Sequence, residues 1–350
     1  MELFRRYGHD DFLDFVKGVC IVFIVLNHCM PDSWLAGSLF CLWGRFAVPI
    51  FLFIQVFHCY KHGLVGLHTQ WGKMWRRVIR PFLIVNVFIV LGLLVRPLLD
   101  GRISLSTVFW SVIPGGPGGY YPWIYVQFAI LLPLIAPLLR RFIGESALQP
   151  NGGKGWWLVA VAFIVVSQCL EVVSCLCHIP EWAYRLLFFR YTFIIFLGYV
   201  ATRPYPLRVA YGDVADEDVR APIWPWLLSL LGVVSIVFFC YSGVSLWPLF
   251  YSYGETHWLC YFHIFTLLFA MRLVYNRMAA ARIAVTSFVK HLGVCSYEIF
   301  LFQLAYFSLF YESVCEITAA IVGNEVLADI VVMVVSLAVC LVPAFFSKRH

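Results

Sequence analysis

Ionisable side chains stand at both ends of one long apolar run near the start of the chain. Asp14 and Lys17 lie at its beginning and His28 at its end. Because charge inside a bilayer is costly, an ionisable group in such a run is a candidate functional residue. Lys17 and His28 are eleven residues apart, so on a helix they lie within roughly 20° of one face and about 16 Å apart along the axis. One helix face therefore presents a cation and a titratable imidazole.

The chemistry open to this pair is anion binding and proton transfer. An imidazole with an ordinary pKa near 6.5 suits a general base, and such proton transfer contributes about 10²- to 10⁴-fold in rate. Asp14 cannot orient His28, because fourteen helical residues separate the two by about 21 Å. A simpler role for Lys17 stays open, in which it reaches the membrane surface or pairs with Asp14.

The elements that must position these residues are membrane helices. Of 350 residues, 62% are hydrophobic and only 13% charged, whereas about a quarter of the residues of a soluble globular protein are charged. The mean hydropathy is +0.85. A helix of about 20 apolar residues is long enough to cross a bilayer. The apolar runs of this chain therefore predict an all-α polytopic membrane protein of ten transmembrane helices. These runs are residues 12–30, 37–59, 78–99, 120–139, 156–176, 183–202, 224–242, 256–274, 291–311 and 326–346. The connections are short, so we expect one transmembrane domain over residues 1–350.

The basic residues predict the orientation in the membrane. Most of them precede the first span, follow the last, or lie in every second connection, and the opposite connections carry mainly acids. By the positive-inside rule both termini are cytoplasmic, in agreement with an even number of spans. The net charge of +6 is thereby explained without a nucleic-acid partner. The twelve cysteines lack metal-binding spacing, so we expect small apolar packing residues and no metal site.

Several further polar groups are predicted in the outer half of the bundle. Lipid cannot satisfy them, so they must face one another, a cavity or water. Simpler roles stay open for each, such as pairing for bundle assembly, an interfacial side chain or a hydrogen-bonded core histidine. Beside the catalytic candidate His28, these residues are Arg45, Arg190, Glu255, His257 and His263, and we expect the last four to bind substrate.

The sequence resembles the integral-membrane acyltransferase 3 family, bacterial proteins of about ten spans that O- or N-acylate glycans and other carbohydrates. The first helix is similar to the family pattern Asp-x-x-Arg-Gly, an apolar run and His, matched by Asp14, Lys17, Gly18 and His28. Further similar segments follow in family order and cover nearly the whole chain: residues 45–54, 121–124 with 131–133, 196–199 and 292–301.

Four residues, at three places, depart from the family pattern. Lys17 replaces the arginine, which keeps the charge but loses the planar fork that grips phosphate or carboxylate. Gln55 and Val56 stand where Ser-Gly is usual, and Gln303 replaces a histidine that often closes the 292–301 segment. These changes bear on contacts with the acyl donor more than on the fold, and His28 is retained.

The resemblance implies an enzyme of the bacterial cytoplasmic membrane that moves an acyl group, acetyl most readily, from cytosolic acyl-CoA to a hydroxyl of a cell-envelope glycan or lipid-linked sugar. It places Lys17 and Asp14 at the donor, His28 as general base, and Arg45 as the group that stabilises the oxyanion. Glu255 is the candidate to orient His28. A covalent acyl-His28 intermediate stays open.

Two other functions stay open from the residues alone. A transporter or flippase for a glycan or small anion would use the same intramembrane charges as a path. A structural partner in a polysaccharide assembly complex would need neither activity.

Overall fold

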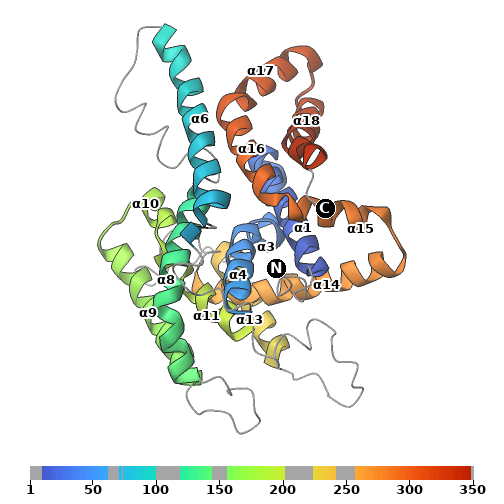
Figure 1. Cartoon of the computed structure of the whole chain (residues 1–350). Helices are drawn as coiled ribbons and strands as arrows, with labels where there is room; N and C mark the ends of the chain where they lie inside the picture. The colour runs from blue at the N-terminus through green and yellow to red at the C-terminus, as the bar shows by residue number, and fades with distance from the viewer. Residues whose placement is uncertain are drawn as a thin grey trace. The chain divides into compact units, whose positions relative to one another are not determined.

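A computed structural model describes residues 10–61, 71–72, 74–99, 119–143, 156–201, 224–241 and 257–347. Within these ranges every regular element is a helix (Figure 1), as the sequence predicts. The chain divides into two compact units: Met1–Ala47, Phe82–Gly119 and Ala270–His350 form the first, and Val48–Pro81 with Tyr120–Phe269 form the second. Each unit is built from segments that are distant in sequence.

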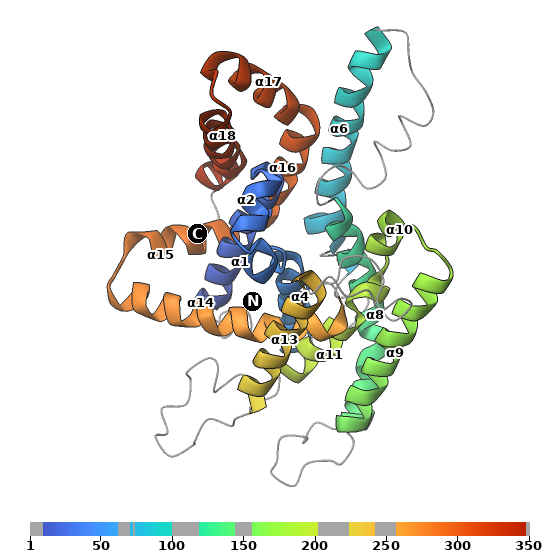
Figure 2. The ribbon, with the colours of Figure 1, turned by 180° about the vertical axis from the view of Figure 1, so that it is seen from behind.

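The first unit contains the two ends of the chain. Its helices are α1 (Asp11–Cys29), α2 (Asp32–Gly37), α3 (Phe40–Trp43), most of α6 (Arg80–Leu99), the end of α14 (His263–Ala280), α15 (Ala284–Val294), α16 (Ser296–Leu309), α17 (Tyr311–Val322) and α18 (Glu325–Phe346). Figures 1 and 2 show α16, α17 and α18 following one another in orange and red, with α17 and α18 packed together.

Helix α1 is the interior helix of this unit. In its apolar stretch 61% of residues are buried, against 22% in the stretches of α6 and α18, whose exposed apolar side chains suit a lipid environment. Asp10 caps α1 by accepting a hydrogen bond from the Leu13 amide at 3.3 Å, which satisfies a donor of the first turn. The helix ends at Cys29, just before Pro31, which cannot continue it.

Two glycines bring α1 and α15 into backbone contact. A Cβ atom on Gly18 would lie 1.9 Å from the Val289 carbonyl oxygen, and one on Gly293 would lie 1.7 Å from the Asp14 carbonyl oxygen. Small residues allow helices in membranes to approach this closely. Gly18 and Gly293 therefore set the position of α1 against α15.

The predicted span 291–311 is wrong as a single straight helix. Helices α15 and α16 meet at Cys295 with a bend of 72°, and α15 already begins at Ala284. Beyond the bend, α16 packs on α18, where the hydroxyls of Tyr306 and Ser336 are 2.9 Å apart.

The second unit is built around another set of helices. They are α4 (Ala47–Lys61), the π-helix η2 (Trp75–Ile79), α8 (Tyr120–Ile143), α9 (Trp156–Leu176), α10 (Glu181–Leu186), the 3₁₀ helix η3 (Phe188–Tyr191), α11 (Thr192–Ala201), α13 (Trp224–Tyr241), the 3₁₀ helix η5 (Trp258–Phe262) and the start of α14. Helices α8 and α9, green in Figures 1 and 2, pack together. Each 3₁₀ helix leads directly into a longer helix.

Each of the ten predicted spans contains helical residues, but not every helix there is long enough to cross a membrane. Six described helices are long and apolar enough to cross a membrane, or seven with the bent pair α15–α16, and Ala47–Lys61, Phe188–Ala201 and Trp226–Tyr241 are shorter apolar helices. The chain is thus a multi-pass membrane protein. The count of ten, the cytoplasmic termini and the single domain remain predictions.

The predicted span 37–59 is also wrong as one helix. Helices α3 and α4 are separated by a turn at residues 44–46, and Leu39 before α3 has a left-handed φ of 54°. The depth expected for Arg45 depended on a continuous helix there, so that depth does not carry over.

Candidate active site

His28 lies in the last turn of α1, half-buried, with its ring centroid 5.5 Å from that of Phe307 on α16. Among the residues that the structure describes, none forms a hydrogen bond with either nitrogen of its ring. Lys17 lies on the same unbroken helix, so the helical spacing predicted for Lys17 and His28 is confirmed. The imidazole is thus held by an aromatic contact, and its nitrogens are not used by the described part of the fold.

Gln303 is the second notable polar residue of this region. Its exposed fraction is 0%, and neither its amide nitrogen nor its amide oxygen has a hydrogen-bond partner among the described residues. It precedes Phe307 by four residues on α16, so both lie on one helix face, and Phe307 contacts His28. A buried amide without partners is costly, and sequence reasoning registered Gln303 only as a departure from a pattern.

An apolar cluster borders His28. Its buried members come from α1, α16 and α18 and are Val25, Cys29, Tyr306, Phe307 and Cys340. Partly buried apolar residues pack around them: Leu26, Tyr311, Val314, Met333, Leu337 and Val339. Such surroundings exclude water, which strengthens electrostatic interactions with a reacting group.

Lys17 and Asp14 form an ion pair at 2.5 Å. The Asp14 residue is only 5% exposed, and its carbonyl oxygen is the atom that Gly293 approaches. The structure therefore agrees with the simpler role that the sequence left open for Lys17, and contact with a donor remains a prediction.

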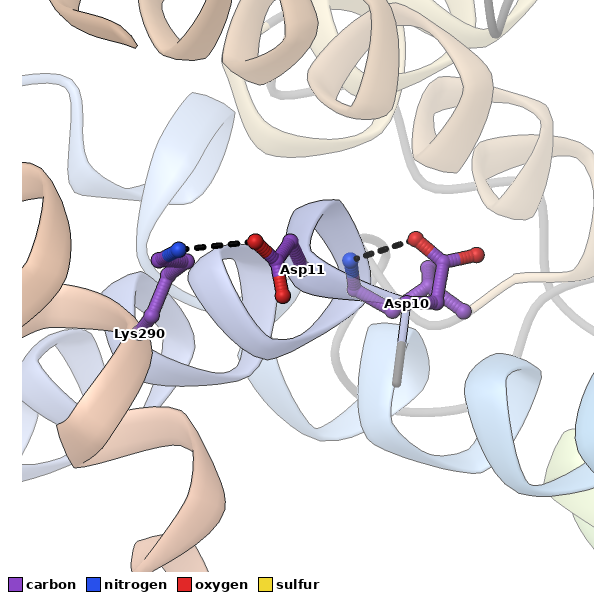
Figure 3. Close-up of polar contacts among 4 residues, drawn as sticks. Asp10, Asp11 and Lys290 are labelled. Carbon is purple, nitrogen blue, oxygen red and sulfur yellow. Dashed lines mark hydrogen bonds and ion pairs between the residues drawn. The ribbon is translucent and has the colours of Figure 1, made fainter. Parts of the chain in front are cut away.

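A second ion pair links α15 to the start of α1. Lys290 lies 2.8 Å from Asp11 (Figure 3), and 28% of the Lys290 side chain and 58% of the Asp11 side chain are exposed. Exposed pairs of this kind contribute only about 0–1 kcal/mol. The glycine contacts, rather than this pair, hold the two helices together.

Arg45 is exposed and lies in the turn between α3 and α4. Its oxyanion role stays a prediction. Glu255 lies outside the described residues.

Two histidines named as candidates, His257 and His263, are buried in the second unit. His257 is 2% exposed and caps η5, where its Nδ1 accepts a hydrogen bond from the Leu259 amide at 3.4 Å. Nε2 then carries the proton and donates to Gln168 Oε1 at 3.1 Å. His263 is buried at the start of α14, where a Cβ on Gly232 would lie 2.3 Å from its backbone nitrogen. Because both ring nitrogens of His257 are engaged, His28 is better suited to accept a proton.

Arg190 is buried in η3 at 6% exposure. Its guanidinium lies 5.7 Å from the ring of Tyr184 and 5.9 Å from the ring of Tyr191. The Tyr261 hydroxyl donates to the Arg190 carbonyl oxygen at 2.8 Å, and the Tyr184 hydroxyl donates to Glu171. Sequence reasoning named Arg190 but missed Glu171, although an acid within the predicted span 156–176 is itself a signal.

Three exposed arginines of the second unit are further candidates for anion binding. Arg76, Arg77 and Arg80 lie on and just after the π-helix η2, and all three are exposed. π-helices occur frequently at functional sites, and arginine is suited to phosphate recognition.

Cysteines and acids of the described ranges offer no metal centre. No group of three or more His, Cys, Asp or Glu there could hold a metal ion. The eleven cysteines whose side chains are described are free.

Comparison with protein families matches the chain to an acyltransferase domain over residues 10–345. No curated protein and no solved structure matches the chain. The match covers both units and extends from the cap of α1 to the end of α18.

Proposed function

The chain belongs to the acyltransferase 3 family and is an acyl-transferring membrane enzyme, and we propose that it moves a short acyl group from cytosolic acyl-CoA to a hydroxyl of a cell-envelope glycan or lipid-linked sugar. Acetyl-CoA is the favoured donor and the bacterial cytoplasmic membrane the proposed location. Membership of an acyltransferase family favours this function over a transporter or a structural partner.

The observation that carries the proposal is the state of the His28 ring. Its nitrogens have no hydrogen-bond partner among the described residues, whereas both ring nitrogens of His257 are used. A general base must be within hydrogen-bond reach of the proton that it removes. An acceptor hydroxyl can approach only an imidazole nitrogen that the fold has not already engaged.

In the proposed reaction, His28 removes the proton of the acceptor hydroxyl while the oxygen attacks the thioester carbonyl carbon. The carbon–sulfur bond then breaks, and the CoA thiolate leaves with the proton that His28 returns. Arg45 is proposed to stabilise the oxyanion formed between these events. A route through acyl-His28 uses the same ring, with its nitrogen as nucleophile.

The donor is proposed to bind through cations on the predicted cytoplasmic side. CoA carries phosphates at its nucleotide end, and the exposed Arg76, Arg77 and Arg80 are suited to bind them by bidentate hydrogen bonds. Lys17 is proposed to contact the donor together with Asp14. Since Asp14 already neutralises Lys17, we expect Lys17 to contribute less to donor binding than the arginines.

Acceptor-dependent release of CoA tests this function. The purified protein in lipid nanodiscs is supplied with deuterium-labelled acetyl-CoA and an envelope-glycan fraction, and free thiol and glycan mass are followed. Thiol release that requires glycan, together with a labelled acetyl mass on the glycan, supports the proposal. An intact thioester in the presence of every glycan fraction contradicts it.

A further inference from the structure

A positive charge is buried in the second unit, and the described residues place no carboxylate in an ion pair with it. Arg190 is 6% exposed, and its Nε has no hydrogen-bond partner among the described residues. Its guanidinium lies over the rings of Tyr184 and Tyr191. Aromatic faces stabilise a cation but do not satisfy its N–H donors.

A buried acid of α9 is engaged by a tyrosine. Glu171 is 6% exposed and accepts a hydrogen bond from the Tyr184 hydroxyl. An arginine retained for bundle assembly is normally paired with a carboxylate, because a buried charge without a partner is strongly destabilising. The fold has placed Glu171 beside a tyrosine instead.

The backbone around Arg190 also favours an anion. Arg190 lies in η3, which leads into the N-terminus of α11, and the hydroxyl of Tyr261 in η5 binds the Arg190 carbonyl oxygen. The 3₁₀ helix η5 leads into the N-terminus of α14. The N-terminus of α11 thus begins two residues after the buried cation, and helix N-termini carry partial positive charge.

We propose that Arg190 binds an oxyanion of the acyl acceptor, either a sugar carboxylate or a sugar phosphate. This inference rests on the proposed function, since it assumes a glycan or lipid-linked sugar as acceptor. The planar guanidinium of arginine can donate two parallel hydrogen bonds to either oxyanion. An acidic sugar and a phosphorylated lipid-linked sugar share this chemistry and are separated by the test.

The test measures binding to the full-length protein in nanodiscs at constant ionic strength. The probes are glucuronate, glucose 1-phosphate and uncharged glucose, and the shift of the thermal unfolding midpoint with probe concentration gives an apparent Kd. We expect at least one anion to raise the midpoint and glucose to leave it unchanged. The stronger of the two anions identifies carboxylate or phosphate as the source.

Substitution identifies the site. Arg190→Gln removes the charge and the fork, so the anion should bind about 10-fold more weakly or worse, the loss expected for a charge-assisted hydrogen bond. Arg272→Gln is the matched control, because Arg272 also stacks on aromatic rings, at 4.9 Å from Phe12 and 5.8 Å from Tyr275. Its anion affinity should equal that of the wild type.

Three results overturn the inference: neither anion stabilises the wild type, Arg190→Gln binds as well as the wild type, or Arg272→Gln loses as much affinity as Arg190→Gln. If Arg190→Gln does not fold, Arg190→Lys decides, because lysine keeps the charge without the fork. An unchanged Kd in Arg190→Lys contradicts the proposal, and a several-fold increase supports it.

The His28→Gln variant distinguishes a failure of the Arg190 site from a failure of the proposed function. His28→Gln should slow acyl transfer by about 10²- to 10⁴-fold while the anion-dependent shift remains. Acyl transfer that is unaffected by His28→Gln, with the anion site intact, contradicts the mechanism alone. A missing anion effect with normal acyl transfer contradicts the Arg190 site alone.

Discussion

Adding one methyl group at Gly18 or Gly293 should disrupt the active site from a distance. The new Cβ would lie 1.9 Å or 1.7 Å from a backbone oxygen, whereas ordinary contacts begin at 3.4 Å. The helices must therefore separate by about 1.5 Å, and because the obstacles are backbone atoms, no side chain can move to relieve the overlap. Overpacking of this kind costs about 1–3 kcal/mol.

This separation should affect catalysis, because α1 carries His28 and the chain continues from Gly293 into α16, which carries Phe307. A misplacement of about 1 Å can lower the rate by about 10²-fold. We therefore expect Gly18→Ala and Gly293→Ala to unfold at a lower temperature and to transfer acyl groups about 10- to 100-fold more slowly.

The assay compares thermal unfolding midpoints and acetyl-CoA turnover in nanodiscs. Gly37→Ala is the matched control, since a Cβ there would meet nothing within 4 Å. Alanine favours helices over glycine by about 1 kcal/mol, so the control should be neutral or slightly stabilised. Wild-type stability and turnover in Gly18→Ala would refute the close contact between α1 and α15.

Two further predictions concern the donor and Gln303. Lys17→Met and the double substitution of Arg76 and Arg77 to Gln should raise KM for acetyl-CoA, and the arginine variant should raise it by about 10-fold or more. Acetyl-pantetheine lacks the nucleotide phosphates, so its KM should be unaffected by the arginine changes. Equal effects on both donors would show that these arginines do not bind the phosphates. Gln303→Leu removes a buried amide that has no described partner, so the fold should be unchanged or stabilised, while acyl transfer should fall if the amide contacts substrate. A less stable protein with normal activity would show that Gln303 serves the fold alone.

The first helix shows what local sequence could predict. Its apolar run, the Asp10 cap and the break before Pro31 all agree on its ends, so the spacing of Lys17 and His28 followed from helical geometry. The same reasoning failed at residues 37–59 and 291–311, where apolar runs are broken at the turn of residues 44–46 and at Cys295. Apolar composition alone does not reveal where such a run bends.

Contacts between distant segments could not be predicted from the sequence. Gly18 and Gly293 are each ordinary in their local sequence, and only tertiary packing brings them against the backbone of the other helix. Glu171 could have been found, because an acid in an apolar run is unusual, but its tyrosine partner comes from the following helix. The hydrogen bond of His257 Nε2 likewise depended on α9, through Gln168.

The most direct test of the central claim is the single-turnover rate of acyl transfer in His28→Gln. Glutamine retains polarity and approximate size but cannot accept and return a proton, so the rate should fall by about 10²- to 10⁴-fold with an unchanged unfolding midpoint. His291→Gln is the matched control, since His291 approaches the Ala344 carbonyl at 2.6 Å and glutamine can still donate that hydrogen bond; its rate should remain near that of the wild type. A folded His28→Gln protein that transfers acyl groups at the wild-type rate would contradict the account.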